Sequence, residues 1–235
     1  MELHTVLSPH IDLDFSRKYD RTHAERYFRK HREGLSRRLS NWRETSIARK
    51  ALRLAGDPAR VLDLPCGAGR FWPMLLERPG RVLFAADNSP DMLAVARESL
   101  PAGMAHRVRT FQTSAFAIDL ADETVDCVFC MRLLHHIGDP KHRLALLREM
   151  RRVTRDTLVI SLWVDGNYKA RRRKRLEADA RRESAEDGYQ NRFVIDRPTA
   201  EAEFRQSGFE IASYVDFLPG YAMWRVYTLR KASQG

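Results

Sequence analysis

The feature that most constrains the fold is the segment 60–70, RVLDLPCGAGR. An apolar run at 61–64 is followed by a glycine-rich turn, CGAG, and then by a helix-compatible segment. A buried strand, a glycine turn and a helix N-terminus bring the backbone close to a ligand, because glycine places no Cβ in the way. The segment alone is common in parallel-sheet proteins, so the residues that follow it decide what it means.

Strands and helices alternate after this segment. We expect strands at 60–64, 81–86, 108–112, 125–131 and 157–164, and helices at 70–77, 90–100 and 140–153. A helix at 197–207 and two strands at 209–217 and 224–229, joined through Pro219 and Gly220, complete the pattern as an antiparallel pair. Apolar strands that alternate with helices predict an α/β fold with a doubly wound, mostly parallel, seven-stranded sheet.

Two helical segments lie outside this alternation. Residues 17–38 combine charges with aromatics, and residues 41–55 have an apolar stripe at helical spacing, so we predict a helical cover over 1–56 and a main domain over 57–235. The stretch 169–185, KARRRKRLEADARRESA, predicts a basic helix within an insertion at about 166–195, after the fifth strand.

The formal charge of +10 is uneven along the chain. Residues 1–60 hold 14 basic and 8 acidic side chains, residues 61–140 hold 7 and 10, and residues 141–190 hold 14 and 8. The excess flanks the glycine turn, which indicates an anionic substrate or surface. A solvated arginine-rich surface is the alternative, because seven of the 41 basic residues are lysine.

The cysteines and the apolar pattern indicate the cellular compartment in which the protein is expected. Three cysteines argue against a disulfide framework, and we find neither a membrane-length apolar run nor a secretory signal at the N-terminus. The expectation is a cytoplasmic protein. Cys127 and Cys130 are three apart in one strand and point to opposite faces, so we predict no metal site there.

An acidic residue follows the second predicted strand. Asp87 comes 18 residues after Gly69, at the spacing where a carboxylate holds both hydroxyls of a ribose. A dinucleotide site needs a third glycine for the pyrophosphate, and Trp72 stands there instead. The two observations favour an adenosine ligand without a pyrophosphate.

Four stretches together resemble the class I S-adenosylmethionine-dependent methyltransferases of the small-molecule type. They are VLDLPCGAGR (61–70), AADNSPDML (85–93), QTSAF (112–116) and VDCVFCMRLLHHI (125–137). The resemblance implies a Rossmann-like fold and S-adenosylmethionine as cofactor. It also implies the cofactor contacts: Gly67, Ala68, Gly69 and Met131 at the methionine part, Asp87, Asn88 and Met92 at the ribose, Ser114, Ala115 and Phe116 at the adenine, and Asp63 orienting the turn or reaching the ammonium group. Two positions depart from the family pattern, because Ser114 replaces a common aspartate and Pro65 a common glycine or alanine.

The acceptor side is expected beyond the fourth strand. His135 and His136 are the candidates for a general base or an orienting group, with Tyr27 as a further catalytic candidate. Tyr19 and Tyr27 could form a lid over the cofactor. The expected acceptor-binding residues are Tyr19, Arg132, Asp165, Tyr168, Arg171 and Arg172. In such enzymes the N-terminal helices and the insertion after strand five cover the substrate.

The sequence thus predicts in-line methyl transfer to an oxygen or nitrogen of a small or polyanionic acceptor, for example a phosphorylated cell-envelope glycan or lipopolysaccharide. Methyl transfer from a sulfonium depends chiefly on positioning the nucleophile and excluding water. Two alternatives stay open: an RNA methyltransferase, and a non-catalytic cofactor- or nucleotide-binding regulatory module of the same fold. Peripheral contact with a membrane surface is compatible with the basic flanks. The sequence makes no prediction of the oligomeric state.

Overall fold

The computed structural model describes residues 11, 34–100, 102–183 and 192–233. Tyr19, Tyr27 and most of the predicted N-terminal cover lie outside the described residues.

A seven-stranded sheet forms the centre of the molecule, in the order β3-β2-β1-β4-β5-β7-β6. Its strands are β1 (Arg60–Asp63), β2 (Val82–Asp87), β3 (Val108–Gln112), β4 (Val125–Cys130), β5 (Thr154–Trp163), β6 (Phe209–Asp216) and β7 (Trp224–Lys231). The first five strands are parallel, and β7 runs antiparallel to both of its neighbours. The predicted doubly wound, mostly parallel sheet is confirmed, including the terminal antiparallel pair.

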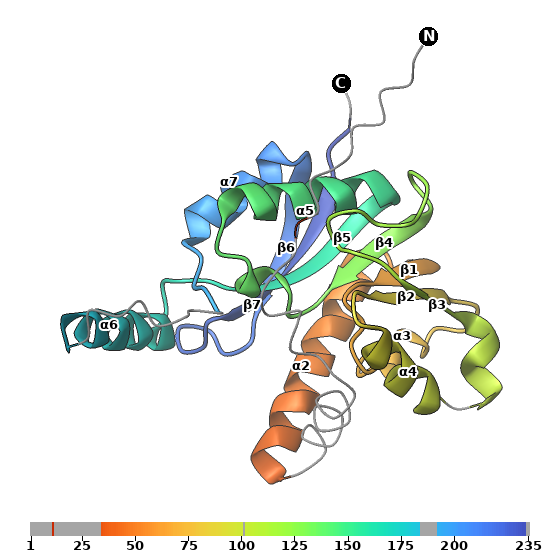
Figure 1. Cartoon of the computed structure of the whole chain (residues 1–235), viewed down its shortest axis with the longest axis horizontal. Helices are drawn as coiled ribbons and strands as arrows, with labels where there is room; N and C mark the ends of the chain where they lie inside the picture. Colours follow the sequence, from red (N-terminus) through yellow and green to blue (C-terminus); the bar gives the residue numbers. More distant parts are fainter. Residues whose placement is uncertain (1–10, 12–33, 101, 184–191, 234–235) are drawn as a thin grey trace.

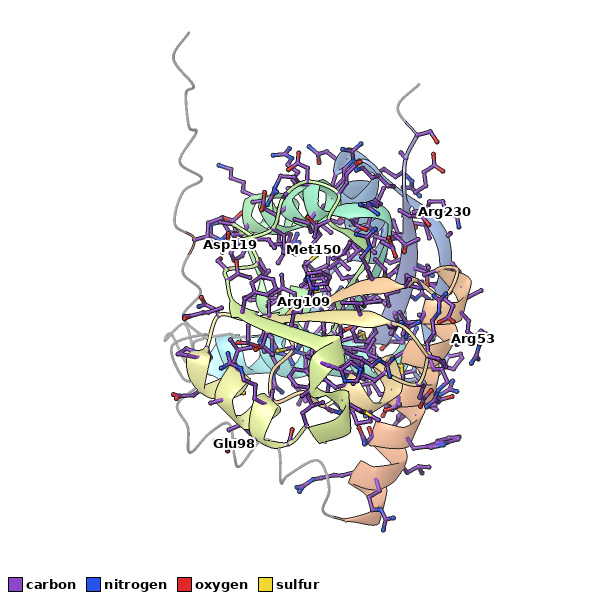
Figure 2. The ribbon with its side chains drawn as sticks, turned by 90° about the vertical axis from the view of Figure 1, so that its right-hand side faces the viewer. Arg53, Glu98, Arg109, Asp119, Met150 and Arg230 are labelled. Atoms are coloured by element: carbon purple, nitrogen blue, oxygen red, sulfur yellow. The ribbon has the colours of Figure 1, made fainter. Side chains whose placement is uncertain are left out.

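Helices cover both faces of this sheet (Figure 1). On one face lie α2 (Leu35–Leu54), α3 (Trp72–Leu75) and α4 (Pro90–Glu98), and on the other lie α5 (Pro140–Val153) and α7 (Arg197–Gln206). Each face has its own apolar core. Figure 2 shows Met150, a residue of α5 whose side chain is buried in the core, whereas Arg53, Glu98 and Arg230 lie on the outside.

The helices predicted at 90–100 and 140–153 are present, and each begins directly after a residue that caps its N-terminus. Ser89 accepts a hydrogen bond from the backbone N–H of Met92, and Asp139 accepts one from that of Lys141. In contrast, the helix predicted at 70–77 is only one turn long, Trp72–Leu75. The glycine turn extends further than the pattern indicated, so fewer residues are left for that helix.

Helix α2 belongs to the core rather than to a separate cover. It begins at Leu35, and its apolar side is buried against the sheet at Ile47, Ala48 and Ala51. The Arg43 guanidinium donates a hydrogen bond of 3.0 Å to the carbonyl of Phe217, just beyond β6. Helix α2, on the N-terminal side of the boundary predicted at residue 56, thus packs against the sheet of the main domain.

The basic helix after strand five is α6 (Tyr168–Glu183), which projects away from the sheet in Figure 1. None of the described helices is long and apolar enough to cross a membrane. Cys127 is buried in the core on the α2 side and Cys130 in the core on the α5 side, which places the two thiols on opposite faces as predicted. No group of three or more metal-binding side chains occurs among the described residues.

Candidate active site

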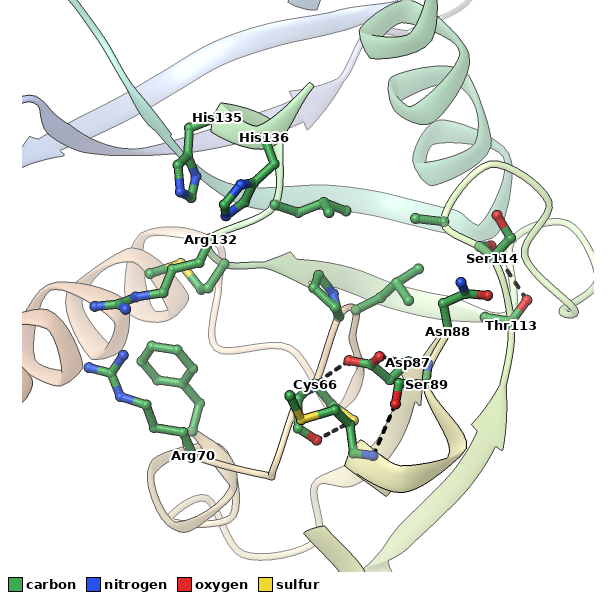
Figure 3. A pocket seen from close by; sticks show the side chains of 18 of the residues that line it. Cys66, Arg70, Asp87, Asn88, Ser89, Thr113, Ser114, Arg132, His135 and His136 are labelled. Carbon is green, nitrogen blue, oxygen red and sulfur yellow. Dashed lines mark hydrogen bonds between the residues drawn. The ribbon is translucent and has the colours of Figure 1, made fainter. Parts of the chain in front are cut away.

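A cavity of about 320 Å³ opens at the carboxyl ends of β1, β2 and β4. The strand order reverses between β1 and β4, which is where open α/β sheets bind ligands. Figure 3 shows its two ends: Asn88, Thr113 and Ser114 lie at one, and Arg132 and His135 at the other, with Asp87 between them.

The glycine turn after β1 is locked to β2. Gly67 and Gly69 have φ angles of +52° and +73°, which side-chain-bearing residues rarely adopt. The Gly67 N–H donates a hydrogen bond of 2.9 Å to the Asp87 carboxylate. A Cβ added at Gly69 would lie 2.9 Å from the indole of Trp72. Trp72 therefore fills the space beside the turn, where a dinucleotide site would need a third glycine.

Asp87 lines the centre of the cavity and is held by backbone donors. Its second carboxylate oxygen accepts a hydrogen bond of 2.9 Å from the Ser89 N–H. Burial raises the pKa of Asp87, and the N–H groups of Ser89 and Gly67 only partly counteract this. A carboxylate fixed in this way keeps further lone pairs for the two hydroxyls of a ribose.

The far end beyond Asp87 is shaped by the loop after β3. Thr113, Ser114, Ala115 and Phe116 all line it. The Ser114 hydroxyl accepts a hydrogen bond of 3.2 Å from the Phe116 N–H, so this side chain shapes its own loop. Asn88, Met92 and Met131 also line the cavity, as the resemblance implied.

Three residues predicted to contact the cofactor do not line the cavity. Asp63 is buried behind the turn, where one carboxylate oxygen accepts a hydrogen bond of 3.2 Å from the indole N–H of Trp72. Burial raises the pKa of Asp63 well above its usual range. This contact agrees with the expectation that Asp63 orients the turn, and its other oxygen has no described partner. Ala68 and Gly69 lie behind Gly67 in the same turn.

The opposite end of the cavity contains His135 and His136, as predicted, together with two tryptophans that the prediction missed. His135 stacks on Trp163 with ring centroids 4.9 Å apart, and it meets Trp224 edge-on at 4.8 Å. Burial, aided by electrostatic repulsion from His136 and Arg132, lowers the pKa of His135 to about 2. His135 is therefore neutral at any physiological pH and is a poor proton acceptor.

Arg132 lies at this end as predicted, held from behind by a residue that the prediction missed. It donates hydrogen bonds of 2.7 and 2.6 Å to the two carboxylate oxygens of Glu44 on α2. Arg70, which also lines the cavity, donates one of 2.6 Å to the same carboxylate. Burial opposes the charge of Glu44, but the two arginines outweigh it and lower its pKa. Helix α2 thus fixes two cavity arginines with one buried carboxylate.

The remaining acceptor candidates lie away from the cavity. Asp165 accepts a hydrogen bond of 3.0 Å from the Arg197 N–H, and Tyr168 is half exposed and stacks on Tyr221 at 5.7 Å. Arg171 and Arg172 are exposed on α6 and do not line the cavity.

The tryptophans could not be found from local pattern. Trp163 ends β5 and Trp224 begins β7, and the antiparallel register places them opposite each other. A sequence signal for them exists only once that register is known. Glu44 has no signal at all, because it lies 88 residues from Arg132 in the chain.

The residues around Asp87 fit a nucleoside ligand. The space where a Cβ of Gly67 would project is open, the fixed carboxylate of Asp87 faces the cavity, and the loop after β3 closes the end. Together with the sheet order, this site defines the class: an S-adenosylmethionine-dependent methyltransferase fold of class I. Residues 61–157 match the sequence model of a family described as "Methyltransferase domain".

Relatives and solved structures agree with this assignment. Over 98 residues the chain is 39% identical to a demethylmenaquinone methyltransferase of Thermus thermophilus. This match covers 40% of this chain and 44% of that protein. Over 104 residues it is 36% identical to a ubiquinone biosynthesis O-methyltransferase of Xanthomonas campestris, covering 42% and 39%. The chain thus spans less than half the length of these curated relatives.

Two solved structures show the breadth of the fold. Magnesium protoporphyrin IX methyltransferase from Synechocystis, with bound S-adenosylhomocysteine, superposes with a TM-score of 0.72 at 14% identity, over 93% of this chain and 98% of that one. The [4+2]-cyclase SpnF superposes with a TM-score of 0.60 at 15% identity, over 80% and 82%. Because a protein described as a cyclase shares the fold, activity must be argued from the site.

Proposed function

We propose that this protein transfers a methyl group from S-adenosylmethionine to an oxygen or nitrogen of a small acceptor. The observation that carries the proposal is one continuous cavity. The fixed carboxylate of Asp87 and the open space at Gly67 form its cofactor half, and Arg132, His135 and His136 line its acceptor half.

When bound, the cofactor supplies a methyl group on a positively charged sulfur. This chain's residues then bind, orient and exclude water, which is most of what methyl transfer requires. His135 contributes a neutral ring, because its lowered pKa prevents it from holding a proton at working pH. His136, which also lines the cavity, becomes the preferred candidate for the general base.

The acceptor is proposed to be anionic, because arginines line the acceptor half. Of the basic start of α6, Arg173 lies over the cavity residue Trp163, 5.1 Å from its ring centroid, whereas Arg171 and Arg172 do not line the cavity. The site therefore favours a small acceptor. A phosphorylated envelope glycan, a lipopolysaccharide or an RNA would have to use the exposed arginines of α6 outside the cavity.

Calorimetry with S-adenosylmethionine and S-adenosylhomocysteine tests the cofactor half. Asp87→Asn should weaken binding about tenfold or more, because hydrogen bonds to a charged group contribute about 1.5–3 kcal/mol. Asp91→Asn, on the first turn of α4, is the matched control and should bind normally. Since burial raises the pKa of Asp87, affinity should fall as the pH is lowered through a midpoint above 3.8, and Asp87→Asn should remove this dependence.

Transfer of labelled methyl into fractionated cell extract tests the reaction. Label in the small-molecule fraction supports the proposal, whereas label in RNA or in envelope glycan selects one of the alternatives. Cofactor binding with no transfer into any fraction would favour the regulatory module. Absence of cofactor binding, or normal binding by Asp87→Asn, would overturn the assignment of the cofactor half.

A further inference from the structure

Three large side chains are exposed where helix α6 meets the turn between β6 and β7. Tyr168, Leu218 and Tyr221 are 52%, 45% and 47% exposed. The N–H of Tyr168 donates a hydrogen bond of 2.9 Å to the carbonyl of Gly220, and the rings of Tyr168 and Tyr221 stack with their centroids 5.7 Å apart. The helix and the turn therefore share one exposed surface that contains both aromatic and aliphatic groups.

The first half of α6 adds positive charge to this surface. The first nine residues of the helix include six basic residues and no acidic one, and the whole helix has eight basic and three acidic residues. Ala170 is buried, and helical spacing places Tyr168, Arg172 and Arg175 on the opposite side of the helix. Both arginines are exposed, as is Arg171 beside them. The outward side of the helix thus carries a tyrosine and a row of arginines.

The exposed leucines favour a lipid surface over a nucleic acid. Leu176 of α6 is 58% exposed, and Leu218 lies at the turn. Aliphatic side chains gain by entering the boundary between headgroups and acyl chains, and tyrosine rings are favoured at the level of the headgroups. Arginines beside them attract anionic headgroups. A single-stranded nucleic acid would need aromatic faces that are open for stacking, whereas Tyr168 and Tyr221 already cover one face of each other.

We infer that the exposed residues of 168–176 and 218–221, which we call the α6 face, bind the surface of an anionic phospholipid bilayer. The arginines contact the phosphate groups, and the leucines and tyrosines enter the boundary between headgroups and acyl chains. Because Arg173 of the same helix lies over the cavity residue Trp163, a bilayer bound here would lie beside the acceptor end of the cavity.

Sedimentation of the full chain with sucrose-loaded vesicles tests the inference. The probes are vesicles of phosphatidylcholine alone and vesicles in which about one lipid in three is phosphatidylglycerol. The protein should bind the anionic vesicles about tenfold more tightly or better, and raising the salt concentration from about 0.1 M to about 0.5 M should remove most of this binding, because salt screens the arginines. Equal binding of the two kinds of vesicle, or no binding to either, would overturn the inference.

Variants locate the surface. Replacing Arg171, Arg172 and Arg175 together by glutamine should weaken vesicle binding about a hundredfold, because each basic residue near an anionic surface contributes about fivefold. The matched control replaces three exposed arginines of α2 and α5, namely Arg38, Arg53 and Arg148. This control should bind nearly as tightly as the wild type, and both triple variants should keep its unfolding free energy. Equal losses of binding in the two triple variants would mean that net charge, and not the α6 face, attracts the vesicles.

The leucine of the turn separates a bilayer from a nucleic acid. Leu218→Ser should weaken vesicle binding about fivefold, because it removes an apolar side chain from the acyl boundary. Leu39→Ser, which removes a 65% exposed leucine of α2, is the matched control and should have no effect. If an oligouridylate binds more tightly than the anionic vesicles and Leu218→Ser changes neither affinity, the α6 face is a nucleic-acid surface and the inference is overturned. None of these measurements depends on methyl transfer, so their failure would leave the proposed function untouched.

Discussion

Replacing His135 by phenylalanine should change how the stability of the protein depends on pH. The imidazole is 3% exposed and packed between Trp163, Trp224 and His136, with ring centroids 4.1–4.9 Å away. This environment lowers its pKa from 6.5 to about 2, so the native state keeps the ring neutral across the acidic range. Phenylalanine preserves a flat ring and has no proton to bind.

The sign and the size follow from proton linkage. Between pH 6.5 and pH 2 the unfolded chain binds a proton at residue 135 that the native chain does not bind, so acid favours unfolding. The slope from this residue approaches about 1.4 kcal/mol per pH unit. Between pH 8 and pH 5 the wild type should therefore lose about 2 kcal/mol of unfolding free energy through His135 alone, and His135→Phe should not lose this part.

Urea unfolding at pH 8, 7, 6 and 5 measures this difference. The quantity to compare is the change in unfolding free energy with pH, because the absolute stability of the variant also contains the repacking of the ring. His106→Gln, which replaces an exposed histidine away from the cavity, controls for the loss of a histidine as such. Parallel pH dependences for the wild type and His135→Phe would refute the idea that His135 is held neutral, and would restore it as a candidate base.

Two further substitutions test the frame of the cavity. Glu44→Gln should lower the unfolding free energy by about 3 kcal/mol, because it leaves the guanidinium groups of Arg132 and Arg70 without their carboxylate. Urea unfolding measures this change. A loss below about 1 kcal/mol would show that solvent replaces Glu44. Gly69→Ala should lower the unfolding free energy by about 2 kcal/mol or more, through its positive φ and through the contact with Trp72. Gly80→Ala is its control in thermal unfolding, because Gly80 has a φ of +74° and open space around its Cβ position, so equal losses would exclude the Trp72 contact as a cause.

Local pattern was sufficient to predict that the glycine turn and Asp87 lie together. Gly67 and Asp87 are 20 residues apart and belong to one strand–helix–strand unit, whose two strands must pair in parallel. The turn after β1 and the end of β2 then meet at one edge of the sheet whatever the rest of the chain does. The role of Trp72 also followed from local pattern, because a bulky residue beside the glycine turn takes the place where a dinucleotide site would need a third glycine.

The acceptor half depends on contacts between distant segments. The arginine-rich start of α6 was the strongest charge signal in the sequence, yet Arg171 and Arg172 lie outside the cavity because the helix projects from the sheet (Figure 1). Charge density along a chain indicates a basic surface, and it does not indicate where that surface faces.

The sequence by itself determined the order of strands and helices, the glycine turn and the carboxylate beside it, because each arises from neighbouring residues or from a single pairing of adjacent strands. The tertiary structure decided the end of the cavity that we propose for the acceptor. It placed Trp224 opposite Trp163 through the antiparallel register of β7, and it brought Glu44 of α2 behind Arg132 through packing on the other face of the sheet. These contacts exist only after the whole sheet has formed, so no local propensity encodes them.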